Sequence, residues 1–210
     1  MGVLHLPRIF YCDMENFKHL YEECISLLPE KRRQKAERII NKNEALLSAT
    51  AGLMMKEVLG ISEDGMIKFG EHGKPFLEHG PCFSISHSRR YSVLAVSENS
   101  IGIDIEMHET FNEQIAKRCF TEEEQDFSKL STENFLRIWT AKEAVLKFLR
   151  TGFSFAPKNF SVLPLFEEHE IAGQKIKLFC SDINGAIFTA AFCGEEEFEF
   201  TEFQPEDLIY

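Results

Sequence analysis

The sequence predicts an α+β protein in which small antiparallel sheets pack against helices. Strand-like and helical segments are segregated along the chain more than they alternate, which is typical of antiparallel sheets. Residues 66–106 have strand-like patterns, whereas residues 133–150 are apolar over most of a helical circumference, as expected of a buried helix. The hydrophobic fraction of 44% and the 20 Phe residues supply enough apolar volume for a core.

The first sixty residues are expected to form one strand followed by helices. Residues 3–11 are apolar and predict a strand, and residues 14–28 predict a helix. Pro29 occupies the first-turn position of a second helical region, where its missing N–H costs nothing. That region is expected to break near residues 41–43 and to end at Gly60.

The middle of the chain is expected to add three strands before it returns to helix. Alternating side chains and intervening turns predict strands at 83–86, 91–96 and 101–106. Thr121 and Glu124 form a capping box, which marks the start of a helix.

The last third of the chain is expected to hold one buried helix and further strands. The helix at 133–150 is expected to end at Gly152, because glycine is favoured just past a helix C-terminus. Four segments complete the predicted strands: 160–163, 175–180, 186–193 and 198–203.

Charge is distributed unevenly between the two lobes that we expect, residues 1–100 and 101–210. The net charge is −11, which argues against a general nucleic-acid binder. The first hundred residues carry 13 Lys and Arg against 13 Asp and Glu, whereas the remainder carries 10 against 21. A polyanionic ligand should therefore find its counter-charges in the first lobe, or in a metal ion held by the second.

Neither the cysteines nor the apolar segments indicate an extracytoplasmic protein. The six cysteines include no C-x-x-C pair, so buried, reduced thiols are expected rather than disulfides or structural zinc. No apolar run approaches the roughly 20 residues that cross a bilayer, and the N-terminus lacks the features of a secretory signal. The sequence predicts a soluble cytoplasmic protein.

The segment I-G-I-D-I-E at 101–106 is the clearest candidate for metal binding. On a strand its isoleucines point to one face while Asp104 and Glu106 point to the other, roughly 6–7 Å apart. Two carboxylates at that spacing suit one hard cation and repel each other without one. The alternative is a half-exposed strand whose acidic residues face water.

The segment W-T-A-K-E-A-V-L-K at 139–147 places Trp139, Glu143 and Lys147 on one helix face. A surface ion pair between Glu143 and Lys147 is one interpretation. The other is a functional or tightly paired charged stripe, because the helix is otherwise largely apolar.

Three further segments could bind a phosphate. F-S-I-S-H-S at 83–88 ends a strand in hydroxyls and an imidazole, G-K-P at 73–75 holds a lysine in a turn, and a basic cluster begins at Lys31. Ordinary turn residues and a solvated helix face are the alternatives. Ser86 and His87 are not expected to act as a hydrolase pair, because neighbouring strand residues face opposite ways and no G-x-S-x-G is present.

The order and spacing of these motifs resemble the 4′-phosphopantetheinyl transferases. The pattern is G-K-P, S-I-S-H-S, I-G-I-D-I-E, then F-x-x-x-E at 120–124, and W-x-x-K-E-A-x-x-K. It is most similar to the monomeric surfactin-synthetase-activator (Sfp) class rather than to the shorter trimeric holo-carrier-protein synthases. The match runs from Gly73 to Lys147, about a third of the chain.

The resemblance implies two similar α/β lobes related by a pseudo-twofold, with the active site between them. It implies transfer of the phosphopantetheine arm of coenzyme A to a serine of an apo acyl or peptidyl carrier protein, with release of adenosine 3′,5′-bisphosphate. A monomer without nucleic-acid or membrane partners is expected.

The resemblance also implies roles for individual residues. Asp104, Glu106 and Glu143 would hold Mg²⁺. Lys147 would reach the pyrophosphate, and Glu143, or a water that it orients, would act as the base for the serine. The coenzyme's 3′-phosphate would meet four side chains: Lys31, Lys74, Ser86 and His87.

Two positions depart from the family pattern. Gln34 stands where a second lysine is common after the one that matches Lys31, although Lys35 is adjacent. Leu46 and Leu47 stand where an arginine that contacts the coenzyme is common. Coenzyme affinity is therefore expected to be weaker, or its contacts to come from elsewhere.

Two other functions are compatible with the same residues. A Mg²⁺-dependent phosphohydrolase or nuclease would need a broad basic groove, which the net charge disfavours. A non-catalytic module that binds coenzyme A or a carrier is disfavoured by the intact Asp104, Glu106, Glu143 and Lys147.

Overall fold

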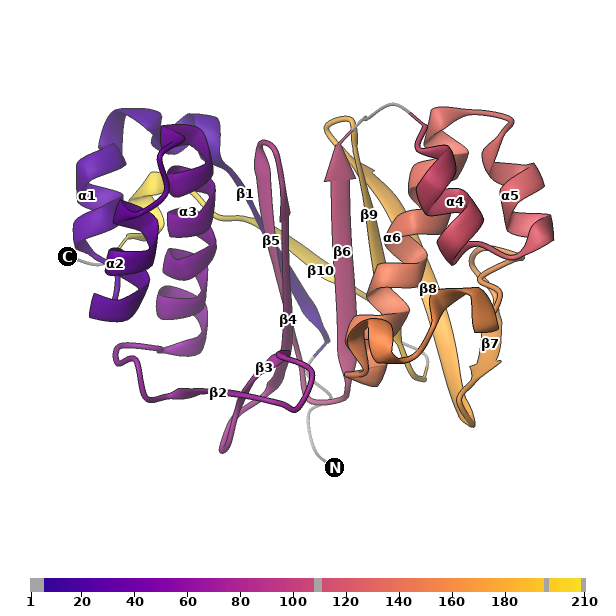
Figure 1. Cartoon of the computed structure of the whole chain (residues 1–210). Helices are drawn as coiled ribbons and strands as arrows, with labels where there is room; N and C mark the ends of the chain where they lie inside the picture. The colour runs from indigo at the N-terminus through magenta and orange to yellow at the C-terminus, as the bar shows by residue number, and fades with distance from the viewer. Residues whose placement is uncertain (1–5, 108–110, 195–196, 209–210) are drawn as a thin grey trace.

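Two four-stranded sheets face each other at the centre of the molecule, and helices cover the outer face of each (Figure 1). The computed structural model describes residues 6–107, 111–194 and 197–208. The predicted α+β class, with mainly antiparallel sheets packed against helices, is confirmed. A twofold relation between the two halves stays a prediction.

The first sheet contains one pair of parallel strands. Strand β1 pairs antiparallel with β5 and parallel with β10. In spatial order its strands are β10 (Glu199–Glu202), β1 (Arg8–Asp13), β5 (Tyr91–Ser97) and β4 (Cys82–Ser88). The helices that cover it are α1 (Tyr21–Ser26), α2 (Glu30–Glu37) and α3 (Lys42–Leu59).

The second sheet is antiparallel throughout. In spatial order its strands are β6 (Ile101–Met107), β9 (Ala186–Phe192), β8 (Gln174–Ile183) and β7 (Glu168–Ile171). The helices on its outer side are α4 (Glu113–Cys119), α5 (Glu122–Ser128) and α6 (Thr132–Leu149). A separate hairpin, β2 (Ile67–Phe69) and β3 (Pro75–Leu77), precedes β4.

Helix ends follow the predicted capping chemistry in most places. The side chain of Asn41 accepts hydrogen bonds from the first turn of α3, and Gly60 ends that helix with a φ of 67°. The capping box of Thr121 and Glu124 is present at the start of α5. The prediction that Gly152 ends the buried helix is wrong: Arg150 takes the left-handed position, with a φ of 61°.

At three places the secondary structure differs from the prediction. Residues 160–163 are not a strand, because their backbone is bonded by the side chains of Glu124 and Lys142 rather than by a neighbouring strand. Strand β7 was not expected. The predicted helix at 14–28 begins as a 3-10 helix, Met14–Leu20, and becomes α-helical only in α1. Residues 3–5 of the first predicted strand lie outside the described residues.

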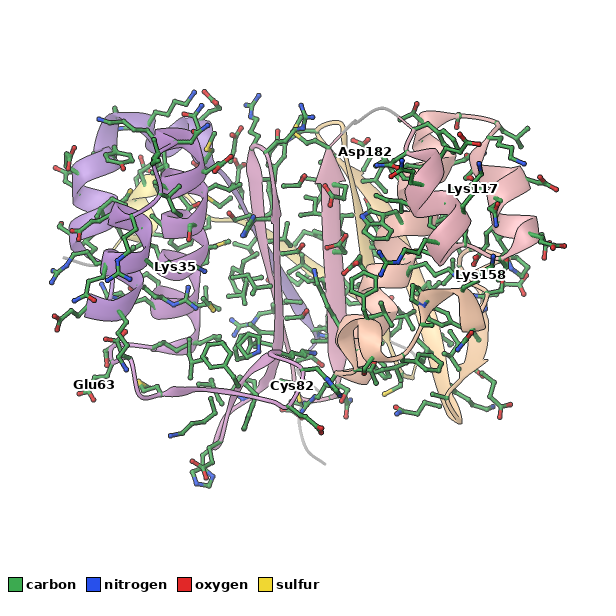
Figure 2. The ribbon with its side chains drawn as sticks, in the orientation of Figure 1. Lys35, Glu63, Cys82, Lys117, Lys158 and Asp182 are labelled. Carbon is green, nitrogen blue, oxygen red and sulfur yellow. The ribbon has the colours of Figure 1, made fainter. Side chains whose placement is uncertain are left out.

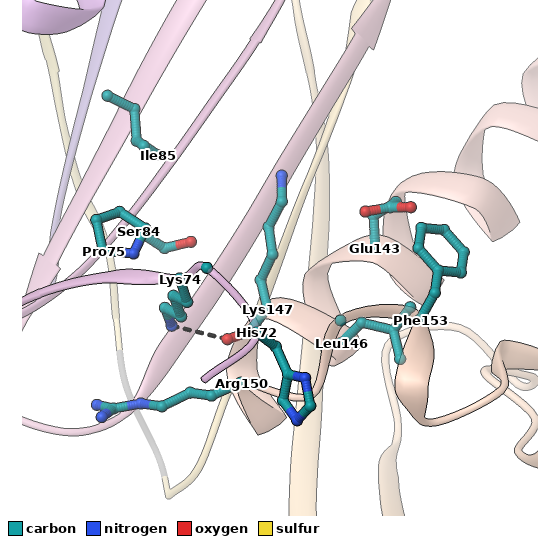
Figure 3. A pocket seen from close by; sticks show the side chains of 12 residues that line it. His72, Lys74, Pro75, Ser84, Ile85, Glu143, Leu146, Lys147, Arg150 and Phe153 are labelled. Carbon is teal, nitrogen blue, oxygen red and sulfur yellow. Dashed lines mark hydrogen bonds between the residues drawn. The ribbon is translucent and has the colours of Figure 1, made fainter. Parts of the chain in front are cut away.

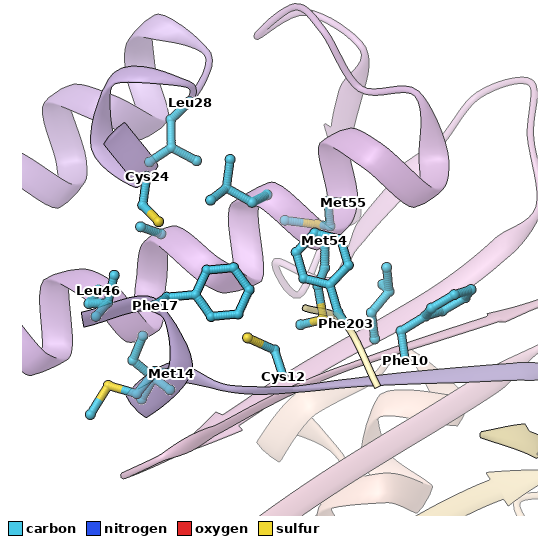
Figure 4. Packing of buried hydrophobic residues seen from close by; sticks show 14 of the residues in the cluster. Phe10, Cys12, Met14, Phe17, Cys24, Leu28, Leu46, Met54, Met55 and Phe203 are labelled. Atoms are coloured by element: carbon cyan, nitrogen blue, oxygen red, sulfur yellow. The ribbon is translucent and has the colours of Figure 1, made fainter. Parts of the chain in front are cut away.

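The C-terminal segment returns to the first lobe. Strand β10 pairs with β1, Phe203 stacks on Phe17 with ring centroids 5.9 Å apart, and Leu208 joins the same core (Figure 4). Strand β10 therefore completes the first sheet, and Phe203 and Leu208 complete its core, although all of them follow the second lobe in sequence. The division of the chain at residue 100 otherwise stays a prediction.

A further core of buried apolar side chains lies between the two sheets, where side chains fill the central space (Figure 2). The three isoleucines of β6 are fully buried there, in one cluster with Tyr91 and Val93 of β5. This arrangement confirms the predicted alternation along 101–106, and it turns the acidic face of β6 toward α6.

The state of the cysteines agrees with part of the sequence analysis. All six cysteines are free, but Cys82 and Cys193 are only partly buried. Within the described parts of the chain, no helix combines the length and the apolarity needed to cross a membrane.

Candidate active site

Gly102 allows helix α6 to lie directly on strand β6. A Cβ at this position would overlap the backbone of α6 at Ala144 O and Phe148 N. Glycine is therefore required for the close approach. The consequence is that Asp104, on the same face of β6, lies against the stripe of α6 that carries Glu143 and Lys147.

Asp104 and Lys147 form a largely buried ion pair between β6 and α6. Lys147 Nζ donates to Asp104 Oδ1 at 2.7 Å, and Ser86 Oγ donates to the same oxygen at 2.7 Å. Asp104 is only 4% exposed, so the interpretation that it faces water is wrong. Lys147 pairs with Asp104 and not with Glu143, so the surface-pair interpretation is also wrong.

The serines of β4 join the two sheets at their adjoining edges. Ser84 Oγ accepts a hydrogen bond from Ile103 N at 3.1 Å, and Ser88 Oγ donates to Glu106 Oε2 at 2.5 Å. Side-chain hydroxyls thus replace a backbone ladder between β4 and β6. They also hold the carboxylates of Asp104 and Glu106 toward the boundary between the lobes.

The carboxylates of this cluster are incompletely compensated. The pKa of Glu143 is raised to about 7, mainly by burial and then by the negative charge of Asp104, while Lys147 opposes the shift. Asp104 Oδ2 is buried and has no hydrogen-bond partner among the described residues. A buried carboxylate oxygen without a partner costs free energy, so this cluster favours an additional positive charge.

The donor chemistry fits a hard cation, but the side chains are not arranged as a finished ligand set. Among residues 6–107, 111–194 and 197–208 no group of three His, Cys, Asp or Glu side chains is placed to hold a metal ion. In this arrangement the ammonium of Lys147 neutralises Asp104, and Ser88 engages Glu106. The assignment of Asp104, Glu106 and Glu143 as metal ligands stays a prediction.

A pocket of about 230 Å³ lies beside this cluster, between α6 and the loop before β3 (Figure 3). Glu143 and Lys147 line it from α6, and Lys74 lines it from the opposite side. Lys74 Nζ donates to Ile101 O and to Lys147 O, each at 2.7 Å. The ammonium of Lys74 is thus already engaged by backbone carbonyls.

His87 lies in a different pocket, of about 620 Å³, formed mainly by α2, α3 and the end of β4. The pKa of His87 is lowered, first by desolvation and then by the positive charges of Lys147 and Lys35. Lys35 and Ser48 line this pocket, whereas Ser86 faces Asp104 on the other side of β4. This geometry confirms that Ser86 cannot use His87 as a base.

The basic helix α2 divides its lysines between two pockets. Lys31 lines a third pocket, of about 250 Å³, while Lys35 borders both this one and the pocket of His87. Gln34 donates to Glu30 at 3.1 Å, one turn earlier on the same helix. Leu47 borders the His87 pocket, so no arginine enters it from that position.

Lys142, from the same motif as Glu143, has a structural position. Its ammonium pairs with Glu124 Oε2 at 2.7 Å, and both side chains are 0% exposed. It also donates to Pro157 O at 2.9 Å and to Phe160 O. The motifs F-x-x-x-E and W-x-x-K-E thus meet in a buried ion pair that joins α5, α6 and the segment after α6.

Known proteins are similar to this chain over much of its length. A sequence model described as the 4′-phosphopantetheinyl transferase superfamily matches residues 100–204. The 4′-phosphopantetheinyl transferase Sfp of Bacillus subtilis strain 168 is 30% identical over an alignment 166 positions long, which covers 72% of this chain and 73% of that protein. The chain belongs to the 4′-phosphopantetheinyl transferase superfamily.

Other members of the superfamily are similarly related to this chain. The transferase gsp of Aneurinibacillus migulanus is 29% identical over 153 residues, which are 68% of this chain but 65% of that protein. The transferase HetI of a Nostoc strain is 36% identical over 111 residues, 46% of each chain. The family and the enzyme class expected from the motifs are confirmed.

Two side chains near the candidate site were not expected from the motifs, because Arg150 and Phe153 line the pocket beside Glu143. Lys35, which the sequence analysis noted next to Gln34, lines the pocket of His87. The helical spacing of four residues between Lys31 and Lys35 could have indicated a shared face. No sequence pattern marks Arg150 or Phe153, because the left-handed turn at the end of α6 decides where they point.

Proposed function

We propose that the protein transfers the 4′-phosphopantetheine group of coenzyme A to a serine hydroxyl of an apo carrier protein and releases adenosine 3′,5′-bisphosphate. The observation that carries this proposal is the Asp104–Lys147 pair, which lies beside Glu143 at the boundary of the lobes. The serine oxygen forms a bond to the phosphorus that bears the pantetheine arm, and the bond from that phosphorus to the bridging oxygen breaks. The serine proton passes to a base.

Asp104, Glu106 and Glu143 would hold Mg²⁺. The unpartnered Oδ2 of Asp104 and the raised pKa of Glu143 support a cation at this cluster. When bound, Mg²⁺ supplies neutralisation of the charge that develops on the pyrophosphate.

Lys147 and Glu143 supply the remaining chemistry in this proposal. The ammonium of Lys147 lines the pocket and can donate to phosphate oxygens while it stays near Asp104. Glu143 lines the same pocket, and its carboxylate, or a water that it orients, is the proposed base for the serine proton.

The pocket of His87 is the proposed site of the coenzyme's 3′-phosphate. Lys35 supplies a cationic group there, which would compensate for Gln34 and for the leucines at 46 and 47. The other three residues that the resemblance assigns to this phosphate do not line the pocket of His87. Ser86 donates to Asp104, Lys31 lines the third pocket, and Lys74 lines the pocket of Glu143.

Partners and location complete the proposal. An acyl or peptidyl carrier protein is the proposed acceptor, and a cytoplasmic monomer is the proposed state. A non-catalytic module of the same fold is the second candidate, favoured only by the absence of a finished metal-ligand set among the described residues.

The test is to incubate the protein with coenzyme A, Mg²⁺ and several apo carrier proteins and to measure each carrier by mass spectrometry. A gain of one phosphopantetheine group on the carrier serine, with equimolar adenosine 3′,5′-bisphosphate, supports the proposal. Binding of coenzyme A without transfer to any carrier supports the non-catalytic module. Release of free 4′-phosphopantetheine and adenosine 3′,5′-bisphosphate without carrier modification would support a phosphohydrolase.

A further inference from the structure

Lys74 joins the two elements that carry the candidate site. Its ammonium donates to the carbonyl of Ile101, the first residue of β6, and to the carbonyl of Lys147, in the last turn of α6. Both donor–acceptor distances are 2.7 Å, and Figure 3 shows the bond to Lys147. A single side chain from the loop before β3 therefore spans the start of one element and the end of the other.

The two acceptors are groups that need a donor. The last carbonyls of a helix lack regular intrahelical partners and carry a partial negative charge, which favours a cation. The amide of Arg150 reaches Lys147 O only at 3.3 Å, through the left-handed turn that ends α6. Lys74 thus strengthens the C-terminal cap of the helix at the residue that bears the active-site ammonium.

The surroundings of Lys74 make it poorly suited to bind an anion. Desolvation by burial, followed by the charge of Arg150, lowers the pKa of Lys74 to about 7. Two of its three N–H groups are already used by carbonyls. It also lies outside the lining of the pocket that holds His87 and Lys35.

We propose that Lys74 is a positioning residue: it fixes the end of α6 against the start of β6, and so holds Lys147 and Glu143 against Asp104, and it does not bind the 3′-phosphate of coenzyme A. This inference rests on the proposed function. It replaces the role that the motif resemblance implies for this lysine.

Steady-state kinetics with coenzyme A and with 3′-dephospho-coenzyme A separates the two roles. Lys74→Met keeps the length of the side chain but removes its donors. We expect kcat to fall by about 10- to 100-fold, because a displacement of about 1 Å at a reacting group costs up to that much. We expect the KM for coenzyme A, and its ratio to the KM for the dephospho form, to stay within about twofold of wild type.

Two further variants calibrate this measurement. Lys68→Met, on the exposed strand β2, removes a lysine from the same hairpin outside the pockets described above and should leave both constants unchanged. Lys35→Met should raise the KM for coenzyme A roughly tenfold and leave that for the dephospho form unchanged, because it removes a charge-assisted contact. If Lys74→Met behaves like Lys35→Met, or like Lys68→Met, the inference is overturned.

Amide hydrogen exchange tests the cross-link without any substrate. In Lys74→Met the amides of Arg150 and Thr151, which are bonded to Lys147 O and Leu146 O, should exchange at least severalfold faster than in wild type and in Lys68→Met. Unchanged exchange would contradict the cross-link. Because this readout needs no transfer activity, it separates failure of the inference from failure of the proposed function.

Discussion

Helix α6 carries two lysines in buried ion pairs, and their surroundings differ. Lys142 pairs with Glu124, and both side chains are 0% exposed. Lys147 pairs with Asp104 at the same distance of 2.7 Å, but its side chain is 27% exposed and lines a pocket. Two ion pairs five residues apart on one helix therefore differ in exposure. The Lys142–Glu124 pair is sealed from solvent, and the Lys147–Asp104 pair is open to it.

The completeness of hydrogen bonding distinguishes the two carboxylates. Glu124 accepts from Thr121 N and Lys142 through one oxygen and from Val162 N through the other. Asp104 Oδ1 accepts two hydrogen bonds, whereas Oδ2 has no partner among the described residues. A buried ion pair whose oxygens are all hydrogen-bonded indicates a structural role. A buried carboxylate oxygen without a hydrogen-bond partner indicates a group that can bind a further ligand.

The largest stability effect is expected at the sealed pair. Lys142→Met leaves Glu124 charged and buried, and the free energy of unfolding should fall by about 3–5 kcal/mol. Urea denaturation measures this change. Lys117→Met, which breaks a pair with side chains 67% and 68% exposed, is the control and should change stability by less than about 0.5 kcal/mol.

The double variant sharpens this prediction. Glu124→Gln combined with Lys142→Met removes both charges, so it should be more stable than Lys142→Met alone. A loss below about 1 kcal/mol in Lys142→Met would show that the sealed pair is not structural.

A smaller effect is expected where β6 meets α6. Gly102→Ala places a methyl group against the backbone of α6, which should lower the free energy of unfolding by about 1–3 kcal/mol and displace Lys147 from Asp104. Gly65→Ala is the matched control, because a Cβ there meets nothing within 4 Å. Equal urea midpoints for the two variants would contradict the close packing of α6 on β6.

Glu143, which lies beside the open Asp104–Lys147 pair, should make the free energy of unfolding depend on pH. The pKa of Glu143 is raised from 4.5 to about 7, mainly by burial. Its contribution to stability is therefore fully present below pH 4.5 and is lost as the pH rises through about 7. Relative to Glu143→Gln, metal-free wild type should lose about 1–3 kcal/mol of unfolding free energy across this range.

Urea denaturation of both proteins below pH 4.5 and above pH 7 checks this dependence. Parallel curves would show that Glu143 has the same proton affinity in the folded and unfolded chains. Above pH 7, added Mg²⁺ should raise the urea midpoint of wild type but not that of Asp104→Asn, if it binds at this cluster.

Local patterns in the sequence predicted most helices and strands of the fold, and they singled out Asp104, Glu143 and Lys147. The alternation at 101–106 correctly placed the isoleucines in a core and the carboxylates opposite them. Features that depend on distant contacts could not be predicted in this way. The return of β10 to β1 and the partners of Lys142 arise only when segments far apart in sequence meet.

The lysines near the candidate site show the same limit. Trp139, Glu143 and Lys147 were placed on one helix face by spacing alone. Spacing could not tell that Lys147 bonds to β6, nor that Lys74 caps the end of the helix, because both contacts cross between elements.

The most direct test of the open site is the mass of an apo carrier protein after incubation with coenzyme A, Mg²⁺ and either wild type or Lys147→Met. Wild type should add one phosphopantetheine group to the carrier serine, and Lys147→Met should slow that transfer by about 10²-fold or more. Its urea midpoint should stay closer to wild type than that of Lys142→Met. Transfer by Lys147→Met at the wild-type rate would contradict the assignment of the Asp104–Lys147 cluster as the site of the reaction.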